Sequence, residues 1–267
     1  MDESESQEIL LEFEGDGFSN FVIFLLCLFY YLDCGRSLPC DPKRRLHRYL
    51  ILIFICFLCF GSYYCYDTPA AMEDIMMKDL SLDATSYMSF YAWYSWPNVV
   101  LSFIGGFLTD RVFGIRLGAI IFASFILAGQ LLFAGGAYAN AYILCIVGRF
   151  VFGIGGENVA VTQNTYASSW FEKSELNFIF GLQLSMARLG STATVNSMGP
   201  IYDSIPGLVG YQRLGKALFV ASATCLFSLI CAMILAGFDR RAERILKKKK
   251  EVQILDHLII NKNIIIE

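Results

Sequence analysis

The chain has 267 residues, of which 56% are hydrophobic and 17% charged, and its formal net charge is −3. Soluble domains have about 45–50% apolar and about 25% charged residues, so this composition indicates a membrane protein and excludes a disordered chain. A chain without net positive charge has no global attraction for phosphates, and we expect no nucleic-acid partner.

The nine cysteines do not form a metal or redox set. Those inside apolar runs are expected to behave as small hydrophobic residues: Cys56, Cys59, Cys145, Cys225 and Cys231. The spacing Cys56-x-x-Cys59 also occurs in redox and zinc sites, but no second pair and no histidine in a polar loop accompanies it. We therefore expect no metal, no cofactor and no enzymatic activity.

Residues 1–42 form an acidic N-terminal tail that contains a short apolar segment at 21–32. A membrane helix needs about 20 residues, and this segment has about 12, so its role stays open. If it spans the membrane, the two termini of the chain lie on opposite sides.

Six later stretches are long and apolar enough to cross a bilayer as helices. They are residues 47–66, 85–108, 117–137, 141–170, 176–198 and 214–238. Gly, Ala and Ser recur through the third to fifth stretches, which favours close helix packing. We predict an all-α membrane protein with a bundle at 43–246 and a basic, then irregular, tail at 247–267.

Lysine and arginine residues are unequally distributed around the predicted spans. Fourteen flank one side and three flank the other. Because basic residues accumulate on the cytoplasmic side, a multi-pass protein with both termini in the cytosol explains the bias. The basic segment 239–250 is then a stop-transfer flank that meets anionic lipid headgroups.

Two predicted spans carry ionisable residues, each of which costs about 2.5–3.5 kcal/mol at the bilayer centre. Arg149, Glu157 and Asn164 form one polar stripe on the fourth span, and the fifth contains Gln183 and Arg188. Glu157 and Arg188 lie within about three residues of their span centres, hence at similar depth.

Two interpretations of this pair remain. One is a buried salt bridge that only locks the bundle. The other is a solvated cavity in which Glu157 binds an ammonium group and Arg188 a carboxylate, which predicts a zwitterionic substrate.

Aromatic residues end the first span, at Tyr63, Tyr64 and Tyr66, and crowd the second. Most such residues form belts at the membrane interface, but Tyr91 and Tyr94 lie deeper and can line a cavity. The substrate-binding residues that we predict are Glu157, Arg188, Asn164, Tyr91 and Gln183.

The loop between the second and third spans reads GGFLTDRVFGIR at 105–116. It resembles the cytoplasmic signature of major facilitator transporters, and GRFVFGIGGE at 148–157 resembles the second signature of that superfamily. The resemblance implies one half of a major facilitator fold, six transmembrane helices in two inverted three-helix repeats. It also implies a conformational latch made of Gly106, Asp110, Arg111, Arg116 and Arg149.

Further segments resemble one family of lysosomal dipeptide transporters within this superfamily: FGSY at 60–63, YAWYSWPN at 91–98, QNTY at 163–166 and FGLQLSMAR at 180–188. The resemblance implies a uniporter in the lysosomal membrane that exports dipeptides by alternating access. The substrate-binding glutamate and arginine of that family match Glu157 and Arg188.

The family also implies a glycosylated lysosomal accessory membrane protein as a partner. The absence of any Asn-x-Ser/Thr sequon in this chain agrees with such a partner. Glu5 with Ile9, Leu10 and Leu11 approximates the acidic dileucine sorting signal of the family, or is part of a short disordered tail. The alternative function is a truncated, non-transporting half that binds or regulates an accessory subunit or the full-length transporter.

Overall fold

The structure is a computed structural model, and it describes residues 45–208 and 210–266. The acidic tail, the apolar segment at 21–32 and the Glu5 motif lie outside these residues. All regular secondary structure of the described residues is helical, and the chain from Arg48 onward forms one unit.

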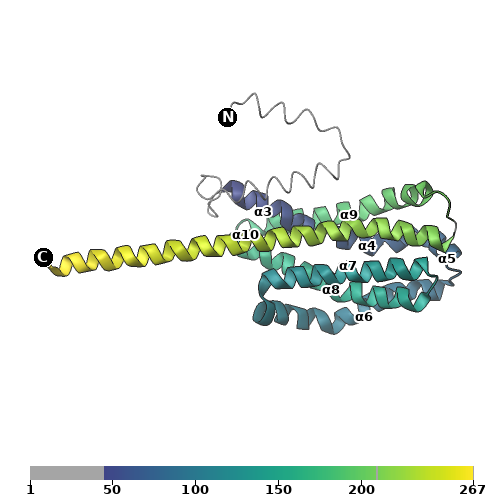
Figure 1. The fold of residues 1–267 in the computed structure, drawn as a ribbon, viewed down its shortest axis with the longest axis horizontal. Coiled ribbons are helices and arrows are strands. Elements are labelled where there is room, and N and C mark those ends of the chain that lie inside the picture. The colour runs from purple at the N-terminus through teal and green to yellow at the C-terminus, as the bar shows by residue number, and fades with distance from the viewer. Residues whose placement is uncertain (1–44, 209, 267) are drawn as a thin grey trace, which may run out of the picture. The chain divides into compact units, whose positions relative to one another are not determined.

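The helices follow the predicted spans. The first span is covered by α3 (Arg45–Leu58) and α4 (Phe60–Ala71), and α5 (Glu73–Asp79) is a short helix between spans. The long helices that follow run side by side (Figure 1): α6 (Ala84–Leu108), α7 (Gly114–Tyr138), α8 (Tyr142–Trp170), α9 (Leu176–Ser204) and α10 (Tyr211–Ile266).

Four helical stretches in the described part of the chain are long and apolar enough to cross a membrane. They are Arg48–Ala71, Ala84–Tyr138, Tyr142–Trp170 and Tyr211–Ile245. The second contains both α6 and α7, so the four stretches hold five of the six predicted spans. The all-α membrane fold is confirmed, whereas the count of six spans is confirmed only in part.

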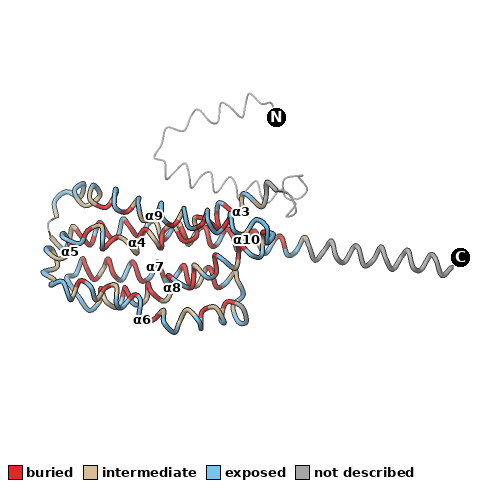
Figure 2. Tube along the Cα trace, turned by 180° about the vertical axis from the view of Figure 1, so that it is seen from behind, coloured by how far each residue is buried: buried red, intermediate tan, exposed pale blue. Residues whose placement is uncertain are grey.

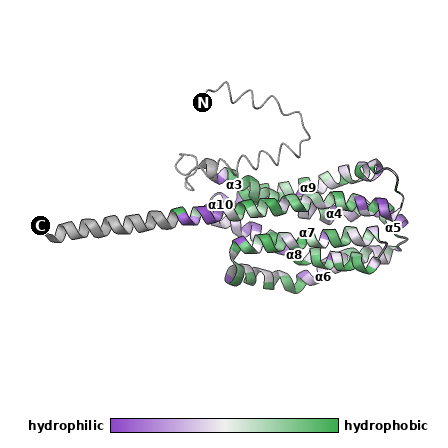
Figure 3. Ribbon diagram, viewed as in Figure 1, coloured by the Kyte–Doolittle hydropathy of each residue, from purple (hydrophilic) through white to green (hydrophobic). Residues whose placement is uncertain are grey.

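The remaining predicted span, the fifth, corresponds to α9, which is helical but too polar to qualify by composition. Figure 3 shows paler, less hydrophobic colours along α9 than along α7 and α10. Residues such as Gln183, Arg188 and Asn196 account for this lower hydropathy.

The C-terminal part of α10 differs from the irregular tail predicted at 247–267, because the helix continues through Ile266. No glycine or proline occurs after Gly237. Lys, Leu and Glu are good helix formers, so local propensity allows the helix to continue even without an amphipathic period.

Glycine residues set the closest helix contacts. A Cβ atom at Gly129 of α7 would lie 2.3 Å from the backbone nitrogen of Phe152, and one at Gly148 of α8 would lie 2.5 Å from that of Phe133. The two backbones therefore approach directly. In addition, α6 packs on α8, and α4 packs on α9 and α10. Figure 2 shows the resulting division between buried and exposed residues along each helix.

The connection between α6 and α7 is a π-helical turn, η2 (Thr109–Phe113), followed by Gly114. Gly114 has φ +69°, in the left-handed region that favours glycine. Here the chain turns from α6 into α7, and this turn carries two residues of the predicted latch, Asp110 and Arg111.

Candidate functional site

The two charges predicted to bind substrate lie near the middles of two successive helices, α8 and α9. Glu157 is one residue from the middle of α8, and Arg188 is two residues from the middle of α9. Both side chains are exposed. Among the described residues the ion pairs involve Arg48 and Arg116, and no salt bridge joins Glu157 to Arg188.

Glu157 accepts a hydrogen bond from a neighbouring helix. The hydroxyl of Tyr94 on α6 donates to its Oε1 atom at 3.4 Å. Two glycines of α8 make room for Tyr94, because a Cβ at Gly153 would lie 2.4 Å from the Tyr94 carbonyl oxygen and one at Gly156 would lie 2.6 Å from its hydroxyl. The glycine-rich segment of α8 thus brings an α6 side chain to the carboxylate.

Tyr94, which contacts Glu157, belongs to a group of four tyrosines on α4 and α6 that we call the tyrosine cluster: Tyr63, Tyr66, Tyr91 and Tyr94. The ring centroid of Tyr66 lies 4.7 Å from that of Tyr94 and 5.7 Å from that of Tyr91. Tyr63 lies within electrostatic reach of both Glu157 and Arg188. The cluster offers hydroxyl groups and aromatic faces next to an acidic and a basic side chain.

Tyr63 and Tyr66 were not among the predicted site residues. Their position at the end of the first predicted span favoured an interfacial belt. The signal that could have found them is their spacing of three residues, which places both near one face of a helix. The continuation of α4 to Ala71 puts them inside the helix rather than at its end.

The other predicted substrate-binding residues divide between the surface and the interior. Asn164 is exposed on α8, about two turns from Glu157. Gln183 is only 4% exposed, on the packed side of α9, and Tyr91 has a buried hydroxyl. The structure therefore leaves Glu157, Asn164 and Arg188 accessible and turns Gln183 towards the core.

Arg149 is buried, with 2% of its surface exposed. Its Nη1 atom donates to the carbonyl oxygen of Cys65 at 3.3 Å, and its guanidinium lies 4.2 Å from the ring centroid of Phe133. The Nε and Nη2 atoms have no hydrogen-bond partner in the structure. The polar stripe predicted on α8 is thus divided, because Arg149 faces the core and Glu157 faces outward.

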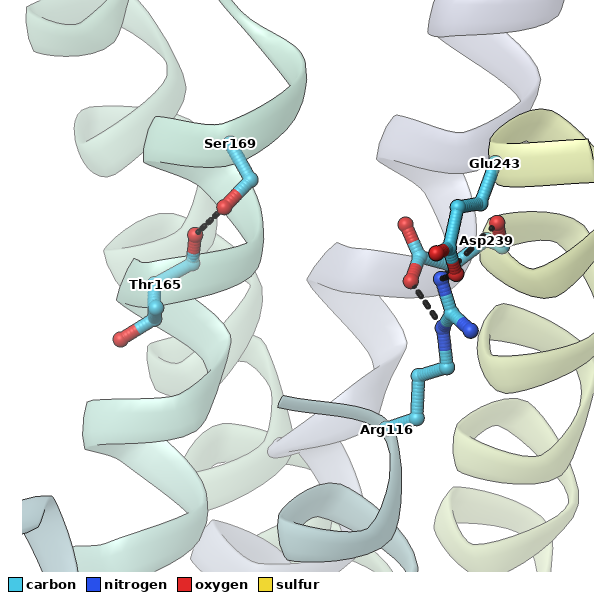
Figure 4. A network of polar contacts seen from close by, with 5 residues as sticks. All are labelled: Arg116, Thr165, Ser169, Asp239 and Glu243. Atoms are coloured by element: carbon cyan, nitrogen blue, oxygen red, sulfur yellow. Dashed lines mark hydrogen bonds and ion pairs between the residues drawn. The ribbon is translucent and has the colours of Figure 1, made fainter. Parts of the chain in front are cut away.

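The predicted latch residues do not all come together. Because α7 and α8 are antiparallel, Arg149 and Arg116 lie towards opposite ends of this helix pair. Arg116 forms ion pairs with Asp239 and with Glu243, the latter at 2.6 Å, and so connects α7 to α10 (Figure 4). Arg111 is exposed in η2.

For two predicted latch residues the structure does not test the prediction. Gly106 has open space where a Cβ would be, and the side chain of Asp110 lies outside the described atoms. Within the described ranges, no group of three His, Cys, Asp or Glu residues could hold a metal ion.

The sequence of the chain was compared with those of known protein families. The Major Facilitator Superfamily matches residues 50–264. The chain belongs to the Major Facilitator Superfamily. Both signatures at 105–116 and 148–157 lie within the matched region, so the resemblance drawn from them is confirmed. Because this is a superfamily of transporters, the prediction that the chain is not an enzyme is also confirmed.

Curated relatives with the name "Lysosomal dipeptide transporter MFSD1" are similar to the chain. The protein of Danio rerio is 60% identical over 214 residues, which cover 79% of this chain and 46% of the relative. That of Homo sapiens is 57% identical with the same coverage, and that of Mus musculus is 56% identical over 217 residues, or 80% and 47%. The chain thus spans about half the length of the curated relatives it matches.

Proposed function

We propose that this chain carries the charged part of the binding site of a membrane transporter for dipeptides. The observation that carries the proposal is the pair Glu157 and Arg188, which are exposed, not bonded to each other, and at mid-helix positions on successive helices of the chain. In lipid each uncompensated charge would cost about 2.5–3.5 kcal/mol, so this pair needs a hydrated cavity or a ligand.

A dipeptide satisfies both groups. Its ammonium group pairs with the Glu157 carboxylate, and its carboxylate takes two parallel hydrogen bonds from the Arg188 guanidinium. Asn164 provides an additional exposed amide on the same helix as Glu157. Transport then proceeds by alternating access around this pair.

The setting that we propose is the lysosomal membrane, with both termini of the chain in the cytosol. The names of the relatives support the organelle, and the excess of basic residues on one side of the spans supports the orientation. A glycosylated accessory membrane protein is the proposed partner. The alternative, a non-transporting regulatory half, has no support in the described residues or in the names of the relatives.

A binding titration tests the proposal. The full chain in lipid nanodiscs is titrated with a dipeptide, with its N-acetylated form and with its C-amidated form. We expect the free dipeptide to bind at least tenfold more tightly than either analogue, because each analogue leaves one charge without its partner. Equal binding of all three ligands, or no binding, would overturn the proposal.

A further inference from the structure

The geometry of Tyr94 points to a role for this residue, which rests on the proposed function. We propose that Tyr94 is a positioning residue that holds the Glu157 carboxylate in place for the ammonium group of the substrate. Its hydroxyl donates to Glu157 Oε1, and no other group among the described residues hydrogen-bonds this carboxylate.

The ring of Tyr94 is fixed on several sides. It is 7% exposed, its centroid lies 4.7 Å from that of Tyr66, and it lies 5.8 Å from that of Phe152. Gly156 is a third neighbour, because a Cβ there would come within 2.6 Å of the hydroxyl. A ring held in this way has few alternative orientations, so its hydroxyl stays directed at the carboxylate.

Glu157, in contrast, has an exposed side chain and would otherwise sample several rotamers. A hydrogen bond from a rigid donor reduces that freedom before the ligand arrives, and preorganisation of this kind increases affinity. Tyr94 therefore acts on recognition of the ammonium end and leaves recognition of the carboxylate end to Arg188.

The test is the variant Tyr94→Phe, which removes only the hydroxyl. The full chain in nanodiscs is titrated with a dipeptide, its N-acetylated form and its C-amidated form. We expect Tyr94→Phe to reduce the preference for the free over the N-acetylated dipeptide by about fivefold, an effect at the weak end for a charged acceptor because the bond is long. The preference over the C-amidated form should stay unchanged.

Tyr64→Phe is the matched control. It removes a hydroxyl that shares a 2.5 Å hydrogen bond with Ser197, between α4 and α9, and that has no contact with Glu157. This variant should leave both preferences unchanged. Should Tyr94→Phe fail to fold, Gly156→Ala displaces the same hydroxyl and should produce the same selective loss.

The outcomes separate the two proposals. If the unmodified chain prefers the free dipeptide but Tyr94→Phe changes neither preference, or changes both equally, the positioning role is wrong and the proposed function stands. If the unmodified chain shows no preference, both proposals fall.

Discussion

Glu157 and Arg188 present opposite charges, and their separate roles can be tested by replacing one charge at a time. We expect Glu157→Gln to remove the preference for a free ammonium group and Arg188→Gln to remove the preference for a free carboxylate. Each loss should be about tenfold or more, as for a hydrogen bond to a charged group. Binding measurements with the two blocked dipeptides check this expectation, with the exposed loop variant Lys173→Gln as control. Two variants with identical effects on both preferences would contradict the assignment of ends.

Arg149 provides a second residue-scale prediction, on stability. Its guanidinium is buried with two nitrogen atoms unpartnered, and burying such a group costs more than an apolar side chain of similar volume. We expect Arg149→Met to change the free energy of unfolding by less than about 1 kcal/mol, or to increase it. Arg149→Ala should lower it by about 2–4 kcal/mol because it leaves a cavity. Thermal unfolding in detergent compares the two variants. Equal losses of stability in Arg149→Met and Arg149→Ala would show that the charge itself stabilises the bundle.

The sequence could identify the charged pair but not the direction in which each polar residue of α8 faces. Arg149 and Glu157 lie at the two edges of a stripe about 80° wide, and periodicity alone assigns one environment to a stripe of that width. The direction in which Arg149 faces depends on contacts with α4 and α7, because Cys65 and Phe133 enclose its side chain. The same limit explains Gln183, which shares α9 with Arg188 but lies on its packed side.

At the scale of elements, glycine positions distinguish contact surfaces from open ones. Gly129 and Gly135 both lie in α7, but only the first faces a neighbouring backbone. We expect Gly129→Ala to destabilise the protein by about 1–3 kcal/mol, because the helices must separate. Gly135→Ala should be neutral or stabilising by up to about 1 kcal/mol, because alanine favours helices. Unfolding temperatures measure both, and an equal response would show that α7 and α8 do not depend on this close contact.

The existence of each helix was predictable, because long apolar runs and recurring small residues are strong local signals. The division of the first span into α3 and α4, and the continuation of α10 to Ile266, were not. The break at Cys59 is not marked by a proline or glycine at that position, and the residues after Gly237 show no amphipathic period that would indicate a helix. Arg116 was predicted as a latch residue, but its partners Asp239 and Glu243 are more than a hundred residues away in sequence, beyond any local pattern.

At the scale of the whole molecule, the proposed orientation places successive loops on opposite sides of the membrane. The six described cysteines are buried, so a chain with Ser in place of Cys27, Cys34 and Cys40 should show little labelling of its own cysteines. In sealed vesicles, we expect a membrane-impermeant maleimide to label Lys173→Cys from the cytosolic side. Asn140→Cys should react only after permeabilisation. Labelling of both residues from one side would contradict the number or direction of the spans.

The narrow contact surface of α9 has a consequence for biogenesis. Its buried residues follow a single line that includes Ala187, Gly190 and Thr194, and the hydroxyl of Thr194 donates to the carbonyl oxygen of Tyr64 at 2.8 Å. A segment this polar partitions poorly from the translocon into lipid by itself. Since α4 is synthesised earlier, α9 can pack against α4 as it leaves the translocon. Retention of α9 in the membrane should therefore depend on a helix made more than a hundred residues before it.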